Sequence, residues 1–467
     1  MIRRMAIFGA TGDLTPRYLL PALARLYETG RLPEGFEIYG LARDDWDTEA
    51  FQSFVEKQLA EHAADVATLA RSGLVEMLEY HRADVTDPEQ VAKALGSSQE
   101  PIVAYLALPP VVFAPTIEAL AGIGLQEGSR IVVEKPFGED LESARKLNRL
   151  LHEAFPEEAV FRADHFLGLQ TVQNILGLRF ANRIFEPVWN HDHVEGVEIV
   201  WDETLALEGR ASYYDTAGAL KDMIQNHLLQ LLCLIAMEPP ITLHEGDLRD
   251  RKADVLRAVR RLSPEEVGRQ SVRARYTAGR SGDKEIPSYV EEEGIDPGRE
   301  TETFAQVILT IDNWRWSGVP FVLRTGKALS RDRMEISVHF KPVPHPAFGQ
   351  RTQPHPNVLR LRLDPDRIHL AANINGPGDP FDLEHIELGV ELAPQDPPAY
   401  GRLLLGVLEG DPTLSIRADE AEESWRIVEP VLEAWTQGSV PLLEYPAGSG
   451  GPEEAAGIRV KYAIRGI

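Results

Sequence analysis

Glycine and polar residues follow the first apolar run of the chain, where residues 9–14 read GATGDL. The run Met5–Phe8 before them predicts a buried strand, and Arg17–Tyr27 after them predicts a helix. Glycine at such a turn lets the backbone approach a pyrophosphate, and the N-terminus of the helix supplies N–H donors and a positive dipole. The spacing is GxxGxL rather than GxGxxG, so the motif alone is a weak signal. Its position in the first strand–helix unit is what indicates dinucleotide binding. The expected dinucleotide contacts are Gly9, Thr11, Gly12, Asp13 and Leu14.

The second strand-like run, Phe36–Leu41, is followed by Arg43 and Asp44. A carboxylate at this position accepts a hydrogen bond from the adenosine ribose of NAD, whereas an arginine pairs with the 2′-phosphate of NADP. Arg43 comes first and Asp44 next, so the segment leaves both coenzymes open. A solvated charge cluster without a ligand is the simpler alternative.

Two further strand ends carry residues that suit a ligand. The run Ile102–Leu106 leads into Leu108 and Pro109, and the next run leads into Lys135 and Pro136. Ligands of open α/β sheets sit at the carboxyl ends of the strands, so coenzyme contacts are expected at these positions. Lys135 suits a hydroxyl or a phosphate, and Pro136 is a candidate cis proline that would fix the turn. A solvated surface lysine is the alternative.

Acid–base residues gather where the two halves of the chain meet. Asp164 and His165 follow the sixth strand-like run, and the helix predicted over Ala217–Met237 carries Asp222 and His227. Asp222 and His227 are five residues apart, about 140° round an α-helix, so they are not expected to share a face. His227 lies on an apolar stripe, which is more typical of a core histidine. A carboxylate partner such as Asp164 would instead make a general base.

Residues 1–167 alternate between short apolar runs and amphipathic stretches. The runs are continuous, which is typical of strands buried on both faces. They are Met5–Phe8, Phe36–Leu41, Val75–Tyr80, Ile102–Leu106, Ile131–Val133 and Val160–Arg162. The helix signals between them are Arg17–Tyr27, Glu49–Leu59, Glu89–Leu95 and Leu141–Phe155. This alternation predicts a Rossmann-type α/β domain with a mostly parallel sheet, which binds the dinucleotide.

Residues 168–467 show another pattern, in which no long helical crossovers separate the later strands. Helices are predicted over Leu169–Asn182 and Ala217–Met237. Strands are predicted over Val194–Trp201, Phe304–Ile311, Pro320–Arg324, Glu335–Phe340, Val358–Leu363, Ile368–Ala372 and Ile386–Leu392. We expect an α+β domain with a large, mostly antiparallel sheet, which binds substrate and offers a dimerisation face. Ala278–Glu300 is rich in Gly, Pro and Glu and predicts a surface loop.

The composition is that of a globular protein of two or three domains, with 467 residues, 43% hydrophobic and 26% charged. The net charge of −25 argues against nucleic-acid binding. The single cysteine, Cys233, excludes an intrachain disulfide and a Cys-rich metal site, and we expect no metal. No segment approaches the ~20 apolar residues of a membrane span. The N-terminus lacks the apolar run of a signal peptide, so we expect a soluble, cytoplasmic protein without a membrane partner.

Nine stretches of the chain resemble glucose-6-phosphate dehydrogenases, and they come in that family's order. They are GATGDLTPR (9–17), ALPP (107–110), EKPFG (134–138), RADHFLGLQTVQN (162–174), RFANRIFEPVWN (179–190), EGRASYYD (208–215), ALKDMIQNHLLQLL (219–232), EEEGIDPGRETETF (291–304) and VPFVLRTGKAL (319–329). The resemblance implies oxidation of C1 of glucose 6-phosphate to 6-phosphogluconolactone, with reduction of NADP or, alternatively, NAD. It also implies a homodimer or homotetramer.

The resemblance assigns roles residue by residue. His227 matches the base that takes the proton from the anomeric hydroxyl, and Asp164 matches the aspartate that orients this histidine. His165 matches a ligand of the substrate phosphate. The positions that match sugar contacts are Lys135, Glu203, Asp222 and Lys327, of which Lys135 is also expected to contact the coenzyme.

The chain departs from the family pattern at the phosphate site. The family's DHYLGK reads DHFLGL here, so Phe166 and Leu169 replace a hydroxyl and an ammonium, and Tyr18 stands where lysine is usual. Charge-assisted hydrogen bonds are worth ~1.5–3 kcal/mol each, so these losses cost roughly two to six decades of affinity without compensation. The candidates for compensation are Arg17, Arg162 and Arg331.

Two alternatives therefore stand beside the family's reaction. The first is a C1 dehydrogenase of an unphosphorylated or differently substituted aldose. The second is a nucleotide-binding regulator without catalysis, against which the retained Asp164, His227 and Lys327 argue.

Overall fold

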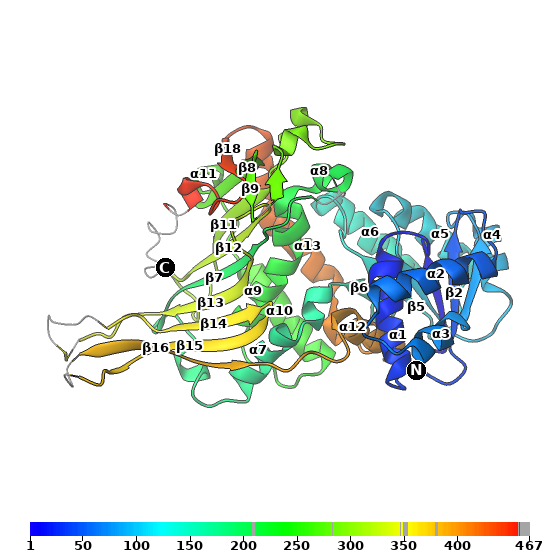
Figure 1. Ribbon diagram of the computed structural model, residues 1–467, viewed down its shortest axis with the longest axis horizontal. Coiled ribbons are helices and arrows are strands. Elements are labelled where there is room, and N and C mark those ends of the chain that lie inside the picture. Colours follow the sequence, from blue (N-terminus) through cyan, green and yellow to red (C-terminus); the bar gives the residue numbers. More distant parts are fainter. Residues whose placement is uncertain are drawn as a thin grey trace. The chain divides into compact units, whose positions relative to one another are not determined.

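The computed structural model describes residues 1–207, 211–282, 284–345, 347–348, 354–378, 382–455 and 457. Glu208–Arg210, which begin one stretch of the resemblance, lie outside the described residues. The chain forms two compact units (Figure 1). Among the described helices, none has the length and apolar composition needed to span a membrane.

Each compact unit is assembled from separate segments of the chain. The first unit comprises Met1–Leu169, Pro240–Asp250 and Gln395–Glu422. The second unit comprises Gln170–Pro239, Arg251–Pro394 and Glu423–Ile467. The sequence suggested one boundary, between residues 167 and 168. The chain first leaves the first unit after Leu169, and two later segments return to it.

The first unit is built on a seven-stranded sheet. Its strands are β1 (Arg4–Phe8), β2 (Glu37–Ala42), β3 (Leu78–Arg82), β4 (Ile102–Leu106), β5 (Arg130–Glu134), β6 (Val160–Ala163) and β17 (Ser415–Ile416). Their spatial order is β17-β6-β5-β4-β1-β2-β3, and β17 alone is antiparallel to its neighbour. The central strands β1 and β4 are buried along their whole length, as their continuous apolar runs predict. The Rossmann-type prediction is confirmed.

Helices connect these strands, and side-chain caps fix where several of them begin. They are η1 (Thr15–Leu19), α1 (Leu20–Glu28), α2 (Thr48–His62), α3 (Thr68–Val75), α4 (Pro88–Leu95), α5 (Phe113–Ile123), α6 (Leu141–Ala154) and α12 (Ala399–Glu409). Asp47 caps α2 through a 2.8 Å bond from the Ala50 N–H. Asp140 and Ser143 form a capping box at α6. α3, α5 and α12 are helices that the sequence analysis did not predict.

The second unit is built on a nine-stranded sheet that Figure 1 shows in green to orange, with red β18. Its strands are β7 (Val194–Asp202), β8 (Ser271–Thr277), β11 (Phe304–Thr310), β12 (Pro320–Gly326), β13 (Arg333–Phe340), β14 (Val358–Leu363), β15 (Asp366–Asn375), β16 (Leu383–Glu391) and β18 (Leu442–Pro446). Their order is β16-β15-β14-β13-β7-β12-β11-β8-β18. Only the pairs β7–β12 and β8–β18 are parallel, so the mostly antiparallel sheet is confirmed.

The second unit also contains helices. They are α7 (Gln170–Phe180), α8 (Ala211–Ala219), η6 (Leu220–Leu228), α9 (Leu229–Ala236) and α11 (Pro264–Gln270), together with the later parts of α10 (Glu245–Ala258) and α13 (Ala418–Thr436). Of these, α7, η6 and α11 contact strands of this sheet. η6 packs on β7, β11 and β12 in the middle of the sheet. This contact places η6 against the central strands of the sheet.

The segment Ala278–Glu300 is more ordered than the predicted surface loop. It contains the short hairpin of β9 (Gly279–Ser281) and β10 (Lys284–Ile286), which is followed by 3₁₀ turns. Tyr289 is 1% exposed and donates a hydrogen bond of 2.7 Å to Asp215. Most of the segment is exposed and irregular, as predicted. The prediction missed the short hairpin and the buried Tyr289, because the Gly, Pro and Glu content does not reveal a single aromatic anchor.

Candidate active site

The turn after β1 has the geometry that the dinucleotide prediction requires. Gly9 has a φ of +87°, and a Cβ at this position would lie 2.3 Å from the carbonyl oxygen of Ala107. The N–H of Gly12 and the hydroxyl of Thr15 both donate to the Gly9 carbonyl, at 3.0 and 3.3 Å. Leu14 immediately precedes the first helical turn. Position 9 therefore requires glycine, because the turn packs closely on the end of β4. The turn leads directly into a helix N-terminus, which is the arrangement that binds a pyrophosphate in dinucleotide-binding domains.

Polar side chains of this turn reach neighbouring segments. The hydroxyl of Thr11 donates to the Asp44 carboxylate at 2.7 Å, which ties the turn to the end of β2. Asp13 forms an ion pair of 2.9 Å with Arg17, and both side chains are more than half exposed. Arg17 is thus already engaged within the turn, on the solvent side.

Arg43 leaves the end of β2 toward solvent. Its side chain is 70% exposed and lies 3.1 Å from Asp84, which follows β3. Hydrogen bonds from Thr86, and then the Arg43 guanidinium, hold the pKa of Asp84 below its usual value. Asp44 is exposed as well, but its carboxylate accepts the hydrogen bond of Thr11, and Arg43 is the exposed cation of this strand end.

The ends of β4 and β5 place the next predicted contacts. Leu108 follows β4, and its Cδ2 lies 3.1 Å from the position that a Cβ on Gly9 would take. Pro109 precedes the 3₁₀ turn Pro110–Val112. Lys135 follows β5 directly, and its peptide bond to Pro136 is cis, as the sequence analysis suggested.

Glu134, which the sequence analysis did not single out, lies buried beside Lys135. It is 8% exposed and accepts a hydrogen bond of 2.5 Å from the hydroxyl of Tyr105 on β4. Burial raises the pKa of Glu134 to about 7, against the lowering effects of Tyr105 and Lys135. A carboxylate at the end of an apolar strand was the signal that could have identified it.

The end of β6 carries Asp164 and His165. Asp164 is 1% exposed and accepts a 3.0 Å hydrogen bond from the N–H of Phe166, which fixes the turn His165–Gly168. His165 stacks on Tyr400 with ring centroids 5.2 Å apart, and Tyr400 stacks on Tyr18 at 5.3 Å. Phe166 packs edge-on against His165 at 5.0 Å. Two of the three departures from the family pattern therefore belong to one aromatic stack.

Arg162 is not available to compensate for the missing phosphate ligands. Its side chain is 1% exposed, and its guanidinium binds Glu157 at 2.9 Å and Asn148 at 3.1 Å. Arg331 is exposed after β12, in the second unit. The suggestion that Arg162 replaces a phosphate ligand is therefore wrong, because its buried guanidinium already binds Glu157 and Asn148.

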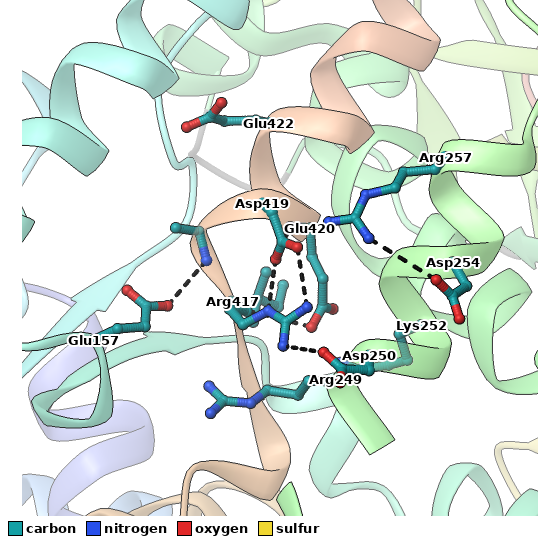
Figure 2. Close-up of polar contacts among 12 residues, drawn as sticks. Glu157, Arg249, Asp250, Lys252, Asp254, Arg257, Arg417, Asp419, Glu420 and Glu422 are labelled. Atoms are coloured by element: carbon teal, nitrogen blue, oxygen red, sulfur yellow. Dashed lines mark hydrogen bonds and ion pairs between the residues drawn. The ribbon is translucent and has the colours of Figure 1, made fainter. Parts of the chain in front are cut away.

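Glu157, which binds Arg162, belongs to a network of polar contacts at the start of α13 (Figure 2). Glu157 also accepts a 3.0 Å hydrogen bond from the N–H of Ala418, at the start of α13. Arg417 next to it binds Asp250 at 2.6 Å and Asp419 at 2.7 Å. These contacts join β6, two residues before Asp164, to segments that enter the first unit later in the chain.

The second unit carries His227 and Asp222 on η6, which is a π-helix. Hydrogen bonds of a π-helix join residues five apart, so Asp222 and His227 lie about one turn from each other on one side. The expectation of separate faces is wrong because it assumed the α-helical period. π-Helical turns occur frequently at functional sites. His227 is 1% exposed, and its backbone N–H donates to the Asn226 side chain at 2.6 Å.

Lys327 and Glu203 meet at the ends of β12 and β7. The ammonium of Lys327, 7% exposed, forms a short ion pair with the Glu203 carboxylate and lies 6.0 Å from the ring of Tyr214. Burial raises the pKa of the Tyr214 hydroxyl, and the nearby charges of Asp222 and Glu203 raise it further. The second unit thus brings Glu203, Asp222 and Lys327 around Tyr214, which the sequence analysis missed.

The predicted site residues are divided between the two units. The first unit holds Asp164, His165, Lys135 and the dinucleotide turn, and the second holds Glu203, Asp222, His227 and Lys327. The pairing of Asp164 with His227 stays a prediction.

Two family models match consecutive parts of the chain. The model described as glucose-6-phosphate dehydrogenase, NAD binding domain, matches residues 6–174. The model described as glucose-6-phosphate dehydrogenase, C-terminal domain, matches residues 176–463. Together they cover almost the whole sequence and divide it close to the first crossing between the compact units.

Known proteins resemble the chain along its full length. The glucose-6-phosphate 1-dehydrogenase of Treponema pallidum is 40% identical, over 97% of this chain and 92% of the relative. That of Mycolicibacterium smegmatis is 42% identical, over 96% of this chain and 94% of the relative. A solved structure of glucose-6-phosphate dehydrogenase in complex with glucose 6-phosphate is 32% identical with a TM-score of 0.89, covering 99% of this chain and 98% of the other. The enzyme from Mycobacterium avium is 36% identical with a TM-score of 0.87, covering 98% and 96%. The chain belongs to the glucose-6-phosphate dehydrogenase family.

Proposed function

We propose that this protein oxidises C1 of glucose 6-phosphate to 6-phosphogluconolactone, with NADP as the preferred acceptor and NAD as a second one. The observation that carries the proposal is the buried His227, on a π-helix that contacts β12 and whose Asp222 lies near Tyr214, as Glu203 and Lys327 do. A protein that only bound nucleotide would have no use for this arrangement. The full-length similarity to glucose-6-phosphate 1-dehydrogenases supports the same reaction.

The residues divide the chemical work between them. His227 takes the proton from the anomeric hydroxyl, because imidazole titrates near neutral pH and is the usual general base there. Asp164 orients the imidazole and stabilises its protonated form. Lys135, Asp222, Glu203 and Lys327 hold the sugar hydroxyls, and His165 contacts the C6 substituent. When bound, the nicotinamide supplies the acceptor for the hydride of C1.

The coenzyme is held by the first unit in this proposal. The glycine turn Gly9–Leu14 fits the pyrophosphate, and Leu108, Pro109 and Lys135 line the neighbouring strand ends. Arg43, the exposed cation at the end of β2, pairs with the 2′-phosphate of NADP. The protein works without a metal and as a homodimer or homotetramer. The half-exposed apolar side chains Leu388 and Val390 on β16 suit a contact between subunits.

A spectrophotometric assay tests the proposal directly. The purified protein is given NADP⁺ or NAD⁺ with a panel of aldoses and aldose 6-phosphates, and formation of reduced coenzyme is followed. We expect the highest kcat/KM with glucose 6-phosphate and NADP⁺. Nucleotide binding without turnover of any sugar would instead support a regulator.

The aromatic stack at the phosphate position favours a second candidate, a C1 dehydrogenase of unphosphorylated aldoses. Tyr18 and Phe166 stand at positions where the family's lysine and tyrosine would meet a phosphate, and the half-buried Leu169 replaces a second lysine. A neutral hydroxymethyl group needs no cation, and burying an ammonium without its anion is costly. Under this candidate free glucose is oxidised with a kcat/KM at or above that for glucose 6-phosphate.

A double variant separates the two candidates. Phe166→Tyr with Leu169→Lys restores one hydroxyl and one ammonium, worth roughly ten- to a hundredfold in preference for the phosphate ester. This shift is expected if the wild type prefers the unphosphorylated sugar. A wild type that already prefers glucose 6-phosphate, with no change in the double variant, removes the second candidate.

A further inference from the structure

The second unit contains a polar cavity of about 570 Å³ that the proposed reaction does not use. Segments far apart in the sequence line it: the end of α8, the start of η6, strand β8, the turn before β11 and the later part of α13. Its charged lining residues are Lys221, Arg273, Arg299, Asp215, Glu300 and Glu302. The volume lies within the range of small-molecule sites.

The two most buried carboxylates of the cavity are already satisfied by the protein. Asp215 is 3% exposed and accepts hydrogen bonds from the Tyr289 hydroxyl at 2.7 Å and the Asp296 N–H at 3.1 Å. Glu302 is 8% exposed and accepts a 2.9 Å hydrogen bond from the N–H of Leu220. Burial raises the pKa of Glu302 above its usual value.

The cations of the cavity are held much more loosely. Among the described residues, the Lys221 ammonium has no hydrogen bond or ion pair. Arg273 is 5% exposed; its Nε donates to the Val440 carbonyl at 3.0 Å, and its Nη2 lies 3.6 Å from Glu300. Arg299 lies 3.6 Å from Asp215. Distances of 3.6 Å exceed those of good charge-assisted hydrogen bonds, so these guanidinium groups keep donors for another ligand.

We propose that this cavity binds a small polyanion, a metabolite with at least two phosphate or carboxylate groups, between Lys221, Arg273 and Arg299. Two guanidinium forks and one ammonium match such groups in both charge and donor geometry. A deeply buried guanidinium whose Nη donors face a cavity instead of a tight carboxylate partner is costly unless a ligand pairs with it.

The same residues couple the cavity to the proposed sugar site. Lys221 precedes Asp222 on η6, and the Glu302 contact to the Leu220 N–H holds the start of that helix. An anion that draws Lys221 toward the cavity therefore acts on the segment that carries Asp222 and His227. Coupling is reciprocal, so the polyanion and glucose 6-phosphate change each other's affinity by the same factor, about five- to 150-fold for typical coupled sites.

Titration calorimetry of the full chain tests whether the cavity binds an anion, whatever reaction the protein catalyses. Only the coupling to the sugar site rests on the proposed function. The probes are inorganic pyrophosphate and tricarballylate, at constant ionic strength set with sodium chloride and with saturating NADPH to occupy the dinucleotide turn. We expect saturable binding of one or both probes. Lys221→Gln with Arg299→Gln should weaken it by at least about tenfold, since each lost charge-assisted bond is worth that much.

Two single variants sharpen the test. Glu300→Gln removes the carboxylate nearest Arg273 and should tighten binding. Arg260→Gln is the matched control, since Arg260 is an exposed arginine of the same unit that pairs with Asp312 outside the cavity. No saturable binding by the wild type, equal binding by the double variant, or an equal loss in Arg260→Gln would each overturn the site.

Coupling is read from the kinetics with glucose 6-phosphate. If a probe binds but leaves KM and kcat unchanged, the coupling is contradicted, whereas the binding site is supported. An enzyme that oxidises no sugar contradicts the proposed function while the calorimetric result still decides the cavity.

Discussion

The proposed reaction depends most on one side chain, the imidazole of His227. Its burial and its place on a π-helix favour a defined orientation over a solvated surface role. We expect His227→Asn to lower kcat by at least the ~10²–10⁴-fold that a lost general base costs. Coenzyme affinity, measured by fluorescence titration with NADPH, should change little, because the dinucleotide turn lies in the other unit. A variant that retains more than about a tenth of wild-type turnover contradicts the assignment of the base.

Coenzyme preference is expected to depend on Arg43. Arg43→Ala should raise KM for NADP⁺ and leave KM for NAD⁺ nearly unchanged, because only NADP carries the 2′-phosphate. The matched control is Arg82→Ala, which removes another exposed strand-end arginine, paired with Asp45 at 2.6 Å. If the control raises KM for NADP⁺ equally, the general positive field and not Arg43 reads the phosphate.

Glu134 makes the stability of the protein depend on pH near neutrality. Its pKa is raised by burial from 4.5 to about 7, so the folded state holds a proton that the unfolded state releases between these values. The stabilisation is complete below the unfolded pKa and is lost as pH rises through about 7. We therefore expect the thermal midpoint of the wild type, relative to Glu134→Gln, to fall between about pH 5 and about pH 8. The exposed Glu139→Gln should show no such trend, and a parallel trend in both variants would remove this role from Glu134.

At the scale of single elements, η6 departs from the α-helical geometry that the sequence periodicity predicts. The apolar residues around His227 predict a helix, and a helix is present, but its π-helical turns place residues five apart on one side. The cause lies partly outside the helix. Gly218, just before it, has φ 68° and ψ 170°, and Glu302 from a distant segment binds the first N–H of η6.

Gly218→Ala tests this dependence. A Cβ on Gly218 would lie 2.5 Å from the Glu302 carboxylate, in a backbone conformation that only glycine adopts readily. We expect the free energy of unfolding to fall by about 1–3 kcal/mol and kcat to fall with it, because η6 carries Asp222 and His227. Gly177→Ala in α7 is the control: nothing lies within 4 Å of the new methyl, so stability should rise by ~0.5–1 kcal/mol. Unchanged stability and kcat in Gly218→Ala would contradict the role of this glycine.

The sequence predicted the elements whose signals are local and missed those that depend on distant partners. The buried strands of the first unit were predicted from continuous apolar runs. The cis peptide bond between Lys135 and Pro136 was predicted from its position directly after a strand. By contrast, Tyr400 stacks on His165 from a segment more than two hundred residues later in the chain, and no local pattern marks it. The orientation of the Arg162 side chain could not be predicted either, since it depends on its partners Glu157 and Asn148.

At the scale of the whole molecule, the first unit is discontinuous in sequence. Helix α12 supplies Leu403, Leu404, Val407 and Leu408 to its hydrophobic core, where all four are buried. Strand β17 pairs with β6 through Ser415 and Ile416. The core and the sheet of the first unit therefore depend on residues 395–422 as well as on residues 1–169.

This discontinuity predicts that residues 1–169 do not form a stable domain by themselves. The four missing side chains of α12 contribute roughly 1.5–3 kcal/mol each, a total of about 6–12 kcal/mol, which is comparable to the whole stability of an ordinary domain. A fusion of residues 1–169 to residues 395–422 through a flexible Gly/Ser linker restores that core and the β6–β17 pair. We expect the fusion to unfold cooperatively in urea and to bind NADPH, whereas the fragment alone exposes its apolar surface and aggregates. Cooperative unfolding of the fragment at the same urea midpoint as the fusion would mean that the sheet of the first unit needs neither α12 nor β17.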